Sequence, residues 1–177
     1  MKADDEASFR EFAGARTVLL RRTAYLLCGD WYLSEDLVQT TLIKLYRVWG
    51  KVHRGGPVDN YCRRILVRCW LDEQRKPWRR KEKRDGVVPE VIDERTDTTA
   101  AGLSDQLVAA LAVLTARQRA TVVLRFCDDL SIAEVADAMG CSPGTVKSQT
   151  ARALDALRTA VHQPAVVEGS AAQRSQS

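Results

Sequence analysis

Residues that hold metals or perform catalysis are scarce in this sequence. Its five cysteines include no Cys-x-x-Cys pair and it has only two histidines, so neither a zinc site nor a disulfide framework is expected. It also lacks a Walker loop, a nucleophile elbow and a dinucleotide-binding fingerprint. These absences predict a protein that is not an enzyme and has no catalytic residues, cofactor, metal or small-molecule substrate. Cys69 and Cys127 stand among apolar residues and are expected to be small buried hydrophobes.

Long apolar runs are missing as well. A run of about 18 apolar residues, the length that crosses a membrane, does not occur. Residues 1–12 lack the basic and apolar regions of a signal peptide. The chain is therefore expected to be cytoplasmic and not embedded in a membrane. With 177 residues, 45% of them hydrophobic, it can form one ordinary domain or two small ones, and two small helical domains fit the pattern best.

Charge is unevenly spread along the chain. Residues 60–84 contain ten Lys or Arg against three acidic residues, whereas residues 85–103 contain five acidic residues against one arginine. The first segment predicts a basic surface. The stretch over residues 79–103, which has no hydrophobic period and turns from basic to acidic, is interpreted as an acidic flexible linker.

Residues 131–158 have the local pattern of a helix-turn-helix. Ser131 can cap a helix, and Glu134, three residues on, can bond back to it. Gly140 suits the end of this helix, and Ser142 followed by Pro143 is typical of the start of the next. The turn of about three residues that remains is the length this motif requires. The pattern makes DNA the first partner to consider.

The second helix of this pattern predicts side chains that contact DNA. Val146, Ala153 and Leu157 share one azimuth, so polar residues on another face can meet base edges or phosphates. The alternative is an ordinary helical hairpin with a solvated polar face. The candidate residues are Thr145, Lys147, Ser148, Gln149 and Arg152.

The N-terminal part is expected to form three helices. Ser34 is predicted to cap the second helix, with Glu35 and Asp36 in its first turn, where they suit the helix dipole. Trp49, Trp70 and Trp78 are interpreted as core anchors and are given no role in DNA binding. The helices are predicted over about residues 8–27, 34–52 and 59–75.

The overall class is predicted to be all-α, with two small helical domains joined by a flexible linker. In the third helix, Tyr61, Ile65 and Cys69 are placed on one face. An apolar helix around Leu107 and Leu111 opens the C-terminal domain. The predicted division is residues 1–78 for the first domain, 79–103 for the linker, 104–163 for the helix-turn-helix domain and 164–177 for a disordered tail.

With these features together, the chain resembles the RNA polymerase sigma factors of the extracytoplasmic function (ECF) group, in the sigma-70 family. Members keep only two core sigma domains, called regions 2 and 4. The resemblance spans roughly residues 10–162. It rests on Ser34-Glu35-Asp36-Leu37-Val38-Gln39, on residues 61–73, and on residues 114–119 with 134–136 and 142–148.

The resemblance implies a factor that binds core RNA polymerase and directs promoter-specific initiation. The first domain would be region 2, which docks on the clamp of the largest catalytic subunit. It would read the minus 10 element as an opened strand, with a base held near the loop over residues 52–60. The second would be region 4, which reads the minus 35 element as duplex. The implied partners are core RNA polymerase through its clamp and flap, promoter DNA, and a separate anti-sigma factor.

The site residues that the resemblance implies form three groups. Thr40, Arg68 and Ala151 depart from residues common in the family, which puts one polymerase contact and the base preference in question. The polymerase-binding group is Glu35, Asp36, Leu37, Gln39 and Thr40. The minus 10 group is Asn60, Arg63, Arg64, Arg68 and Arg75. The minus 35 group is Thr145, Lys147, Ser148, Gln149, Ala151 and Arg152.

Two alternatives remain open at this point. The acidic linker either follows the path it takes in relatives, through the polymerase towards the active-site cleft, or is a solvated tether. The whole chain could also be a helix-turn-helix regulator that acts without being a polymerase subunit. That alternative predicts binding to duplex DNA without polymerase.

Overall fold

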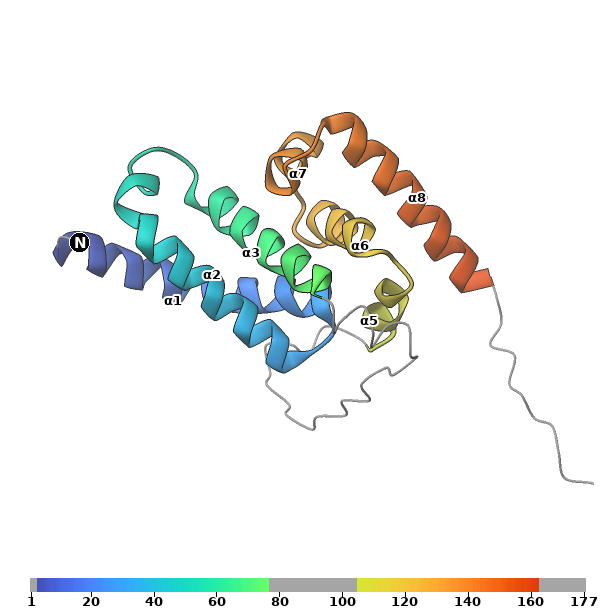
Figure 1. Cartoon of the computed structure of the whole chain (residues 1–177), viewed down its shortest axis with the longest axis horizontal. Helices are drawn as coiled ribbons and strands as arrows, with labels where there is room; N and C mark the ends of the chain where they lie inside the picture. Colours follow the sequence, from blue (N-terminus) through green and yellow to red (C-terminus); the bar gives the residue numbers. More distant parts are fainter. Residues whose placement is uncertain (1–2, 77–104, 163–177) are drawn as a thin grey trace, which may run out of the picture.

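The computed structural model describes residues 3–76 and 105–162, and every regular element in these two ranges is a helix (Figure 1). The predicted all-α class is therefore confirmed. None of the described helices is long and apolar enough to cross a membrane. The predicted linker and C-terminal tail lie outside the described residues.

Three helices form an N-terminal bundle: α1 (Ala3–Cys28), α2 (Trp31–Val52) and α3 (Val58–Arg75). α2 runs back along α1, and α3 packs against both (Figure 1). Their apolar faces meet in a core where Leu26, Leu45 and Leu66 are completely buried. Each leucine buried in this way contributes roughly 1.5–3 kcal/mol relative to an exposed one.

Trp49, near the C-terminal end of α2, packs against the N-terminal part of α1. Its ring lies edge-on to Phe9, with centroids 5.2 Å apart, and its indole Nε1 donates a hydrogen bond to Ser8 Oγ at 2.8 Å. Trp70 is also buried. Trp49 and Trp70 are therefore core residues, as predicted, and Trp78 lies outside the described residues.

The start of α2 differs from the prediction. The helix begins three residues before Ser34, and Asp30 is its N-cap, accepting a hydrogen bond from Leu33 N at 2.9 Å. Ser34 is completely buried inside the helix, where its hydroxyl donates to Trp31 O at 2.7 Å. The prediction that Ser34 caps the helix, with Glu35 and Asp36 in the first turn, was wrong. Gly29 sets the start instead, because its φ of 71° makes a turn that other residues adopt poorly.

The face of α3 predicted to carry Tyr61, Ile65 and Cys69 is only partly buried. Cys69 is buried as expected, but Tyr61 is 37% exposed and Ile65 is only half-buried. The buried positions are Cys62, Leu66, Val67, Cys69 and Trp70.

The C-terminal bundle consists of α5 (Asp105–Ala112), α6 (Ala116–Val122), the π-helical turn η1 (Val123–Cys127), α7 (Ile132–Met139) and α8 (Pro143–His162). Thr115 caps α6 by accepting from Gln118 N, and the Gln118 side chain accepts from Thr115 N in return. The chain from Ala116 to Cys127 is therefore a short α-helix that widens into a π-turn. Cys127, at the end of that turn, is half-buried and not fully buried as expected.

The helix caps and the helix end predicted for the helix-turn-helix are confirmed. Ser131 Oγ accepts from Glu134 N at 3.2 Å, while Glu134 Oε2 accepts from Ser131 N at 2.8 Å. Gly140 ends α7 in the left-handed region, with φ 63°. Ser142 Oγ then accepts from Thr145 N at 3.1 Å at the start of α8. Each cap satisfies backbone groups that a helix end leaves without a partner.

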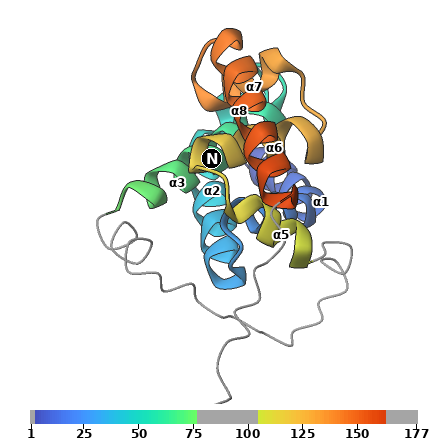
Figure 2. The same ribbon diagram turned by 90° about the vertical axis from the view of Figure 1, so that its right-hand side faces the viewer.

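The two bundles pack against each other. α3 lies along α7, and α1 contacts η1 and α6 (Figure 1). α8 packs on α6 and α7 and lies on the side of the molecule away from α1 and α2 (Figures 1 and 2). The inner side of the C-terminal bundle therefore covers part of the N-terminal one, while α8 faces outward.

Candidate nucleic-acid interface

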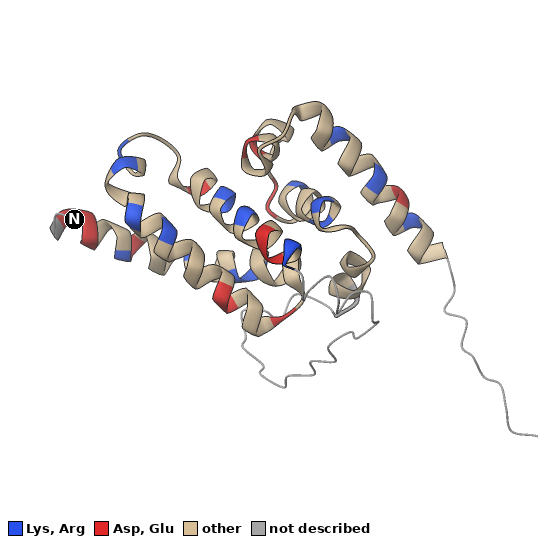
Figure 3. Ribbon diagram, in the orientation of Figure 1, with Lys and Arg blue, Asp and Glu red and all other residues tan. Residues whose placement is uncertain are grey.

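The outer face of α8 gathers most of the side chains predicted to contact duplex DNA. Val146 and Ala153 are buried against the bundle, which turns Lys147, Ser148, Ala151 and Arg152 to the outside. Basic positions recur along this helix in Figure 3. The remaining two predicted residues, Thr145 and Gln149, are half-buried beside them.

The cations on α8 differ in their surroundings. Arg158 is paired with Asp155 on the same helix, at 2.9 Å. Within residues 3–76 and 105–162, neither Lys147 nor Arg152 forms an ion pair. Their charged groups are therefore available to phosphates or base edges.

The basic face of α3 is divided into an open and a covered part. Arg68 and Arg75 are exposed. In contrast, Arg63 Nε lies 3.6 Å from Asp128 Oδ2, and Arg64 Nη1 lies 3.4 Å from Asp137 Oδ1. Both acids belong to the C-terminal bundle.

Asn60, the remaining member of the predicted minus 10 group, also faces the C-terminal bundle. Its side chain lies close enough to Glu134 on α7 to help lower the pKa of that carboxyl. The structure therefore brings three of the five predicted residues, Asn60, Arg63 and Arg64, against acids of α7 and of the connection between η1 and α7. Sequence reasoning did not anticipate this contact.

Asp128 is the most enclosed of these acids. Its side chain is only 2% exposed, and both carboxylate oxygens accept from Thr23 Oγ1, at 2.9 and 3.1 Å. Burial raises the pKa of Asp128, although the hydrogen bond from Thr23 and the charges of Arg63 and Arg22 lower it. The net shift is upward, so the cost of burying this carboxylate outweighs the attraction of its partners.

Arg119 on α6 makes a further link between the bundles. Its Nε donates to Leu26 O, near the C-terminal end of α1, at 2.6 Å, and the side chain is buried. Burial lowers the pKa of Arg119. A Cβ atom at Gly29 would lie 3.5 Å from Arg119 Nη2 and 3.2 Å from Val108, so glycine there allows the close approach.

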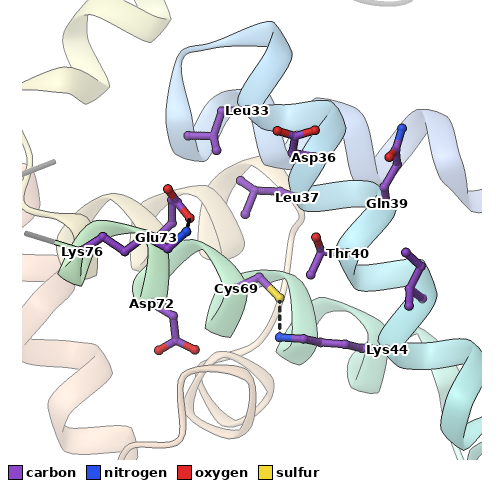
Figure 4. Close-up of a pocket in the computed structure, with 11 residues that line it drawn as sticks. Leu33, Asp36, Leu37, Gln39, Thr40, Lys44, Cys69, Asp72, Glu73 and Lys76 are labelled. Atoms are coloured by element: carbon purple, nitrogen blue, oxygen red, sulfur yellow. Dashed lines mark hydrogen bonds and ion pairs between the residues drawn. The ribbon is translucent and has the colours of Figure 1, made fainter. Parts of the chain in front are cut away.

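A groove of about 530 Å³ between α2 and α3 contains four of the five residues predicted to bind polymerase (Figure 4). Asp36, Gln39 and Thr40 are exposed along its edge, and Leu37 is buried at its base. Glu35 points elsewhere, since its carboxylate pairs with Arg21 Nε at 2.7 Å.

The opposite wall of this groove was missed by the sequence reasoning. It comes from Cys69, Asp72 and Glu73 of α3 and from Lys76, the C-cap of that helix, and Lys44 Nζ of α2 reaches across to Cys69 Sγ at 3.3 Å (Figure 4). These four residues follow the i, i+3, i+4, i+7 spacing of one helix face. This helical spacing is the feature of the sequence that could have indicated the second wall of the groove.

Comparison with known proteins adds two family matches. Residues 16–80 match the family model for Sigma-70 region 2, and residues 104–157 match that for Sigma-70, region 4. The chain is 35% identical over 153 residues to the RNA polymerase sigma-E factor of Streptomyces avermitilis, covering 85% of this chain and 83% of that one. It is 29% identical over 150 residues to the ECF RNA polymerase sigma factor EcfG of Rhodopseudomonas palustris, covering 85% and 83%.

A solved structure is similar over nearly the same length. The sigma factor RpoE from Bartonella quintana, in a co-crystal with the anti-sigma factor NepR, superposes with a TM-score of 0.70 at 28% identity. The match covers 87% of this chain and 96% of that one.

Proposed function

Because this chain belongs to the ECF group of RNA polymerase sigma factors, which bind RNA polymerase, direct promoter-specific transcription and are not enzymes, we propose that it reads its promoter with two separate surfaces. One surface is the outer face of α8 and the other is the basic face of α3. This membership removes the alternative of a regulator that acts without polymerase. The domains remain proposed as residues 1–78 and 104–163.

α8 is the proposed reader of the minus 35 element. In a helix-turn-helix the second helix enters the major groove and its N-terminal residues meet base edges. Lys147, Ser148 and Arg152 occupy the outward face of this helix, and Ala151 offers a small apolar contact beside them. Thr145 and Gln149 flank this face. The observation that carries the proposal is the combination of the confirmed helix-turn-helix caps with unpaired cations on the outer face of α8.

The basic face of α3 is the proposed reader of the minus 10 element. Arg68 is open to a separated strand, and Arg75 is exposed although it pairs with Asp72 at 3.5 Å. Asn60, Arg63 and Arg64 extend the same face towards the loop that precedes α3. Basic side chains of this kind track a single strand through its phosphates. Arg68 stands where relatives often carry asparagine, so we expect an altered base preference at this position.

The groove between α2 and α3 is the proposed polymerase-binding site. It offers an apolar base at Leu37 and polar edges at Asp36, Gln39 and Thr40, a combination that suits a helical partner. The clamp of the largest catalytic subunit is the proposed occupant, with the flap as partner of the C-terminal bundle. Glu35 is bound to Arg21 in the unbound chain and would contact polymerase only after leaving that pair.

A separate anti-sigma factor is the proposed regulator. The support is the similarity to RpoE, whose structure contains the anti-sigma factor NepR. Such a protein would hold the chain away from polymerase or promoter.

Run-off transcription with purified core polymerase tests the function directly. The experiment compares templates from candidate promoters with and without this chain. We expect a transcript of defined length only when both the chain and its promoter are present. Absence of a chain-dependent transcript on every candidate promoter, with a known sigma factor active in parallel, would contradict the proposal.

A further inference from the structure

The groove between α2 and α3 contains a thiol and an amine in direct contact. Lys44 Nζ of α2 donates a hydrogen bond to Cys69 Sγ of α3 at 3.3 Å (Figure 4). Acidic side chains line the same groove, yet Lys44 forms no ion pair among the described residues. Asp72 of the opposite wall pairs with Arg75 instead. The Lys44 ammonium group therefore contacts the thiol and not a carboxylate.

The surroundings of Cys69 differ from those of the cysteines in the core. Burial raises the pKa of Cys62 to about 12 and also raises the pKa of Cys127, so both thiols stay in the protonated form that reacts poorly with oxidants. Cys69 is 7% exposed and lines a groove of about 530 Å³, where an ammonium group contacts its sulfur. Thiols that reach solvent beside a lysine are typical of oxidation-sensitive cysteines. Cys69 is therefore the thiol that a small oxidant in the groove meets beside an amine.

We propose that Cys69 and Lys44 form a redox switch in this groove: a peroxide oxidises the Cys69 thiol, and the Lys44 amine then bonds to the oxidised sulfur. In the first step the peroxide O–O bond breaks, one oxygen joins the sulfur as a sulfenic acid, and the other leaves as water. The sulfur gives up two electrons, and the peroxide accepts them. In the second step an S–N bond forms and the S–O bond breaks, as when a sulfenic acid condenses with a nitrogen. The hydroxyl leaves as water with one ammonium proton, and a second proton passes to solvent.

The S–N bond joins the two walls of the groove. It is shorter than the present 3.3 Å between Lys44 Nζ and Cys69 Sγ, so it draws the walls together, and it removes the charge of Lys44. The consequence rests on the proposed function, which takes this groove as the polymerase-binding site. A bridge across the groove occupies space that the clamp needs, so oxidation reduces polymerase binding. A dithiol reverses the switch, because its two sulfurs form a disulfide as the Cys69 thiol and the Lys44 amine are released.

Peptide mapping by mass spectrometry of the full chain, treated with hydrogen peroxide, tests the bond itself. We expect the peptides that contain Lys44 and Cys69 to be linked, with a mass lower than their sum by two hydrogens, and dithiothreitol to separate them. Lys44→Arg, which keeps the charge, and Cys69→Ser should not form this link. Lys51→Arg is the matched control and should form it, because Lys51 is an exposed lysine of the same helix that has no hydrogen bond to a thiol among the described residues. A disulfide between two cysteines, a sulfinic acid at Cys69 with Lys44 unmodified, or an unoxidised Cys69 would overturn the inference.

Binding of core polymerase to the full chain, labelled at its N-terminus and followed by fluorescence anisotropy, tests the consequence. After the peroxide is removed, we expect the oxidised wild type to bind roughly tenfold more weakly than the reduced wild type, and dithiothreitol to restore binding. The oxidised and reduced samples of Cys69→Ser should bind equally. Equal binding by the linked and the reduced wild type would overturn the switch. Failure of the reduced wild type to bind core polymerase would instead contradict the proposed function, while peptide mapping still decides whether the pair reacts.

Discussion

The two basic surfaces of this chain use the same residue types in different surroundings. On α8, Arg152 stands on an outward face with no ion pair among the described residues. On α3, Arg63 and Arg64 face Asp128 and Asp137 of the other bundle. A count of basic residues in the sequence does not separate these cases. The difference teaches that a basic helix face can be left open or be paired with acids of the other bundle, as Arg63 and Arg64 are in the unbound chain.

Arg119→Ala breaks the attachment between the bundles most severely. A buried hydrogen bond from a charged group contributes roughly 1.5–3 kcal/mol, and its removal leaves Leu26 O without that donor. We expect the free energy of unfolding to fall by that amount in urea titrations followed by tryptophan fluorescence. Arg117→Ala, on the exposed side of the same helix, should change it by less than about 0.5 kcal/mol. Equal effects of the two changes would show that Arg119 does not link the bundles.

Arg152→Ala tests the proposed DNA contact on the outer face of α8. If Arg152 contacts a base, its loss weakens recognition of the upstream promoter element by roughly 1–3 kcal/mol. Arg158→Ala is the matched control, because Arg158 is already bound to Asp155. Promoter titrations with the reconstituted polymerase measure both. An unchanged promoter profile for Arg152→Ala would remove this residue from the minus 35 reader.

Ser131→Ala tests how far the caps of the helix-turn-helix hold α7 in place. Loss of a serine N-cap costs roughly 1 kcal/mol, which urea unfolding detects. Thr159→Ala removes a comparable hydroxyl on exposed α8, where it bonds only to the backbone of its own helix. We expect a clearly smaller change there. The account of α7 fails if both changes are equally mild.

The Glu134 carboxylate predicts a small pH dependence. Hydrogen bonds from the Ser131 backbone, then from the Ser131 side chain and Asn60, together with the charge of Arg63, hold the pKa of Glu134 below its usual range. A depressed pKa stabilises the fold fully above the ordinary glutamate pKa, and this stabilisation is lost as pH falls through the depressed value. Unfolding measured over acidic pH should therefore show a loss in the wild type that Glu134→Gln lacks. Parallel curves would contradict this assignment.

The features that could be predicted from the sequence are local ones. Ser131, Glu134, Gly140 and Ser142 act on backbone groups three or four residues away, so their roles follow from spacing. The resemblance to the sigma factors singled out Asp36, Leu37, Gln39 and Thr40, and these four residues line one wall of the groove. It failed at Ser34 because Asp30 stands one helical turn earlier and is also a good cap. Spacing alone does not decide which of the two residues caps the helix. Here the turn at Gly29 leaves Asp30 at the cap, and Ser34 is buried inside the helix.

The contacts between the bundles could not be predicted in this way. Arg119 meets Leu26 across 93 residues of sequence, and Asp128 meets Thr23 across 105. No periodicity connects such positions, and a basic segment alone does not reveal which of its cations the protein covers. Predicting the α3 wall of the groove also required knowing that α2 packs on α3, although the helical spacing of its residues could be read from the sequence.

Energy transfer between the two bundles tests the central claim most directly. Donor and acceptor dyes, introduced through non-natural amino acids at the exposed positions Lys51 of α2 and His162 of α8, leave the native thiols and the proposed sites untouched. We expect high transfer efficiency in the unbound full chain and a clear fall when core polymerase and promoter DNA are added, because a strand bound along the proposed α3 face would displace Asp137 of α7 from Arg64. An efficiency that stays the same in the complex would contradict the account.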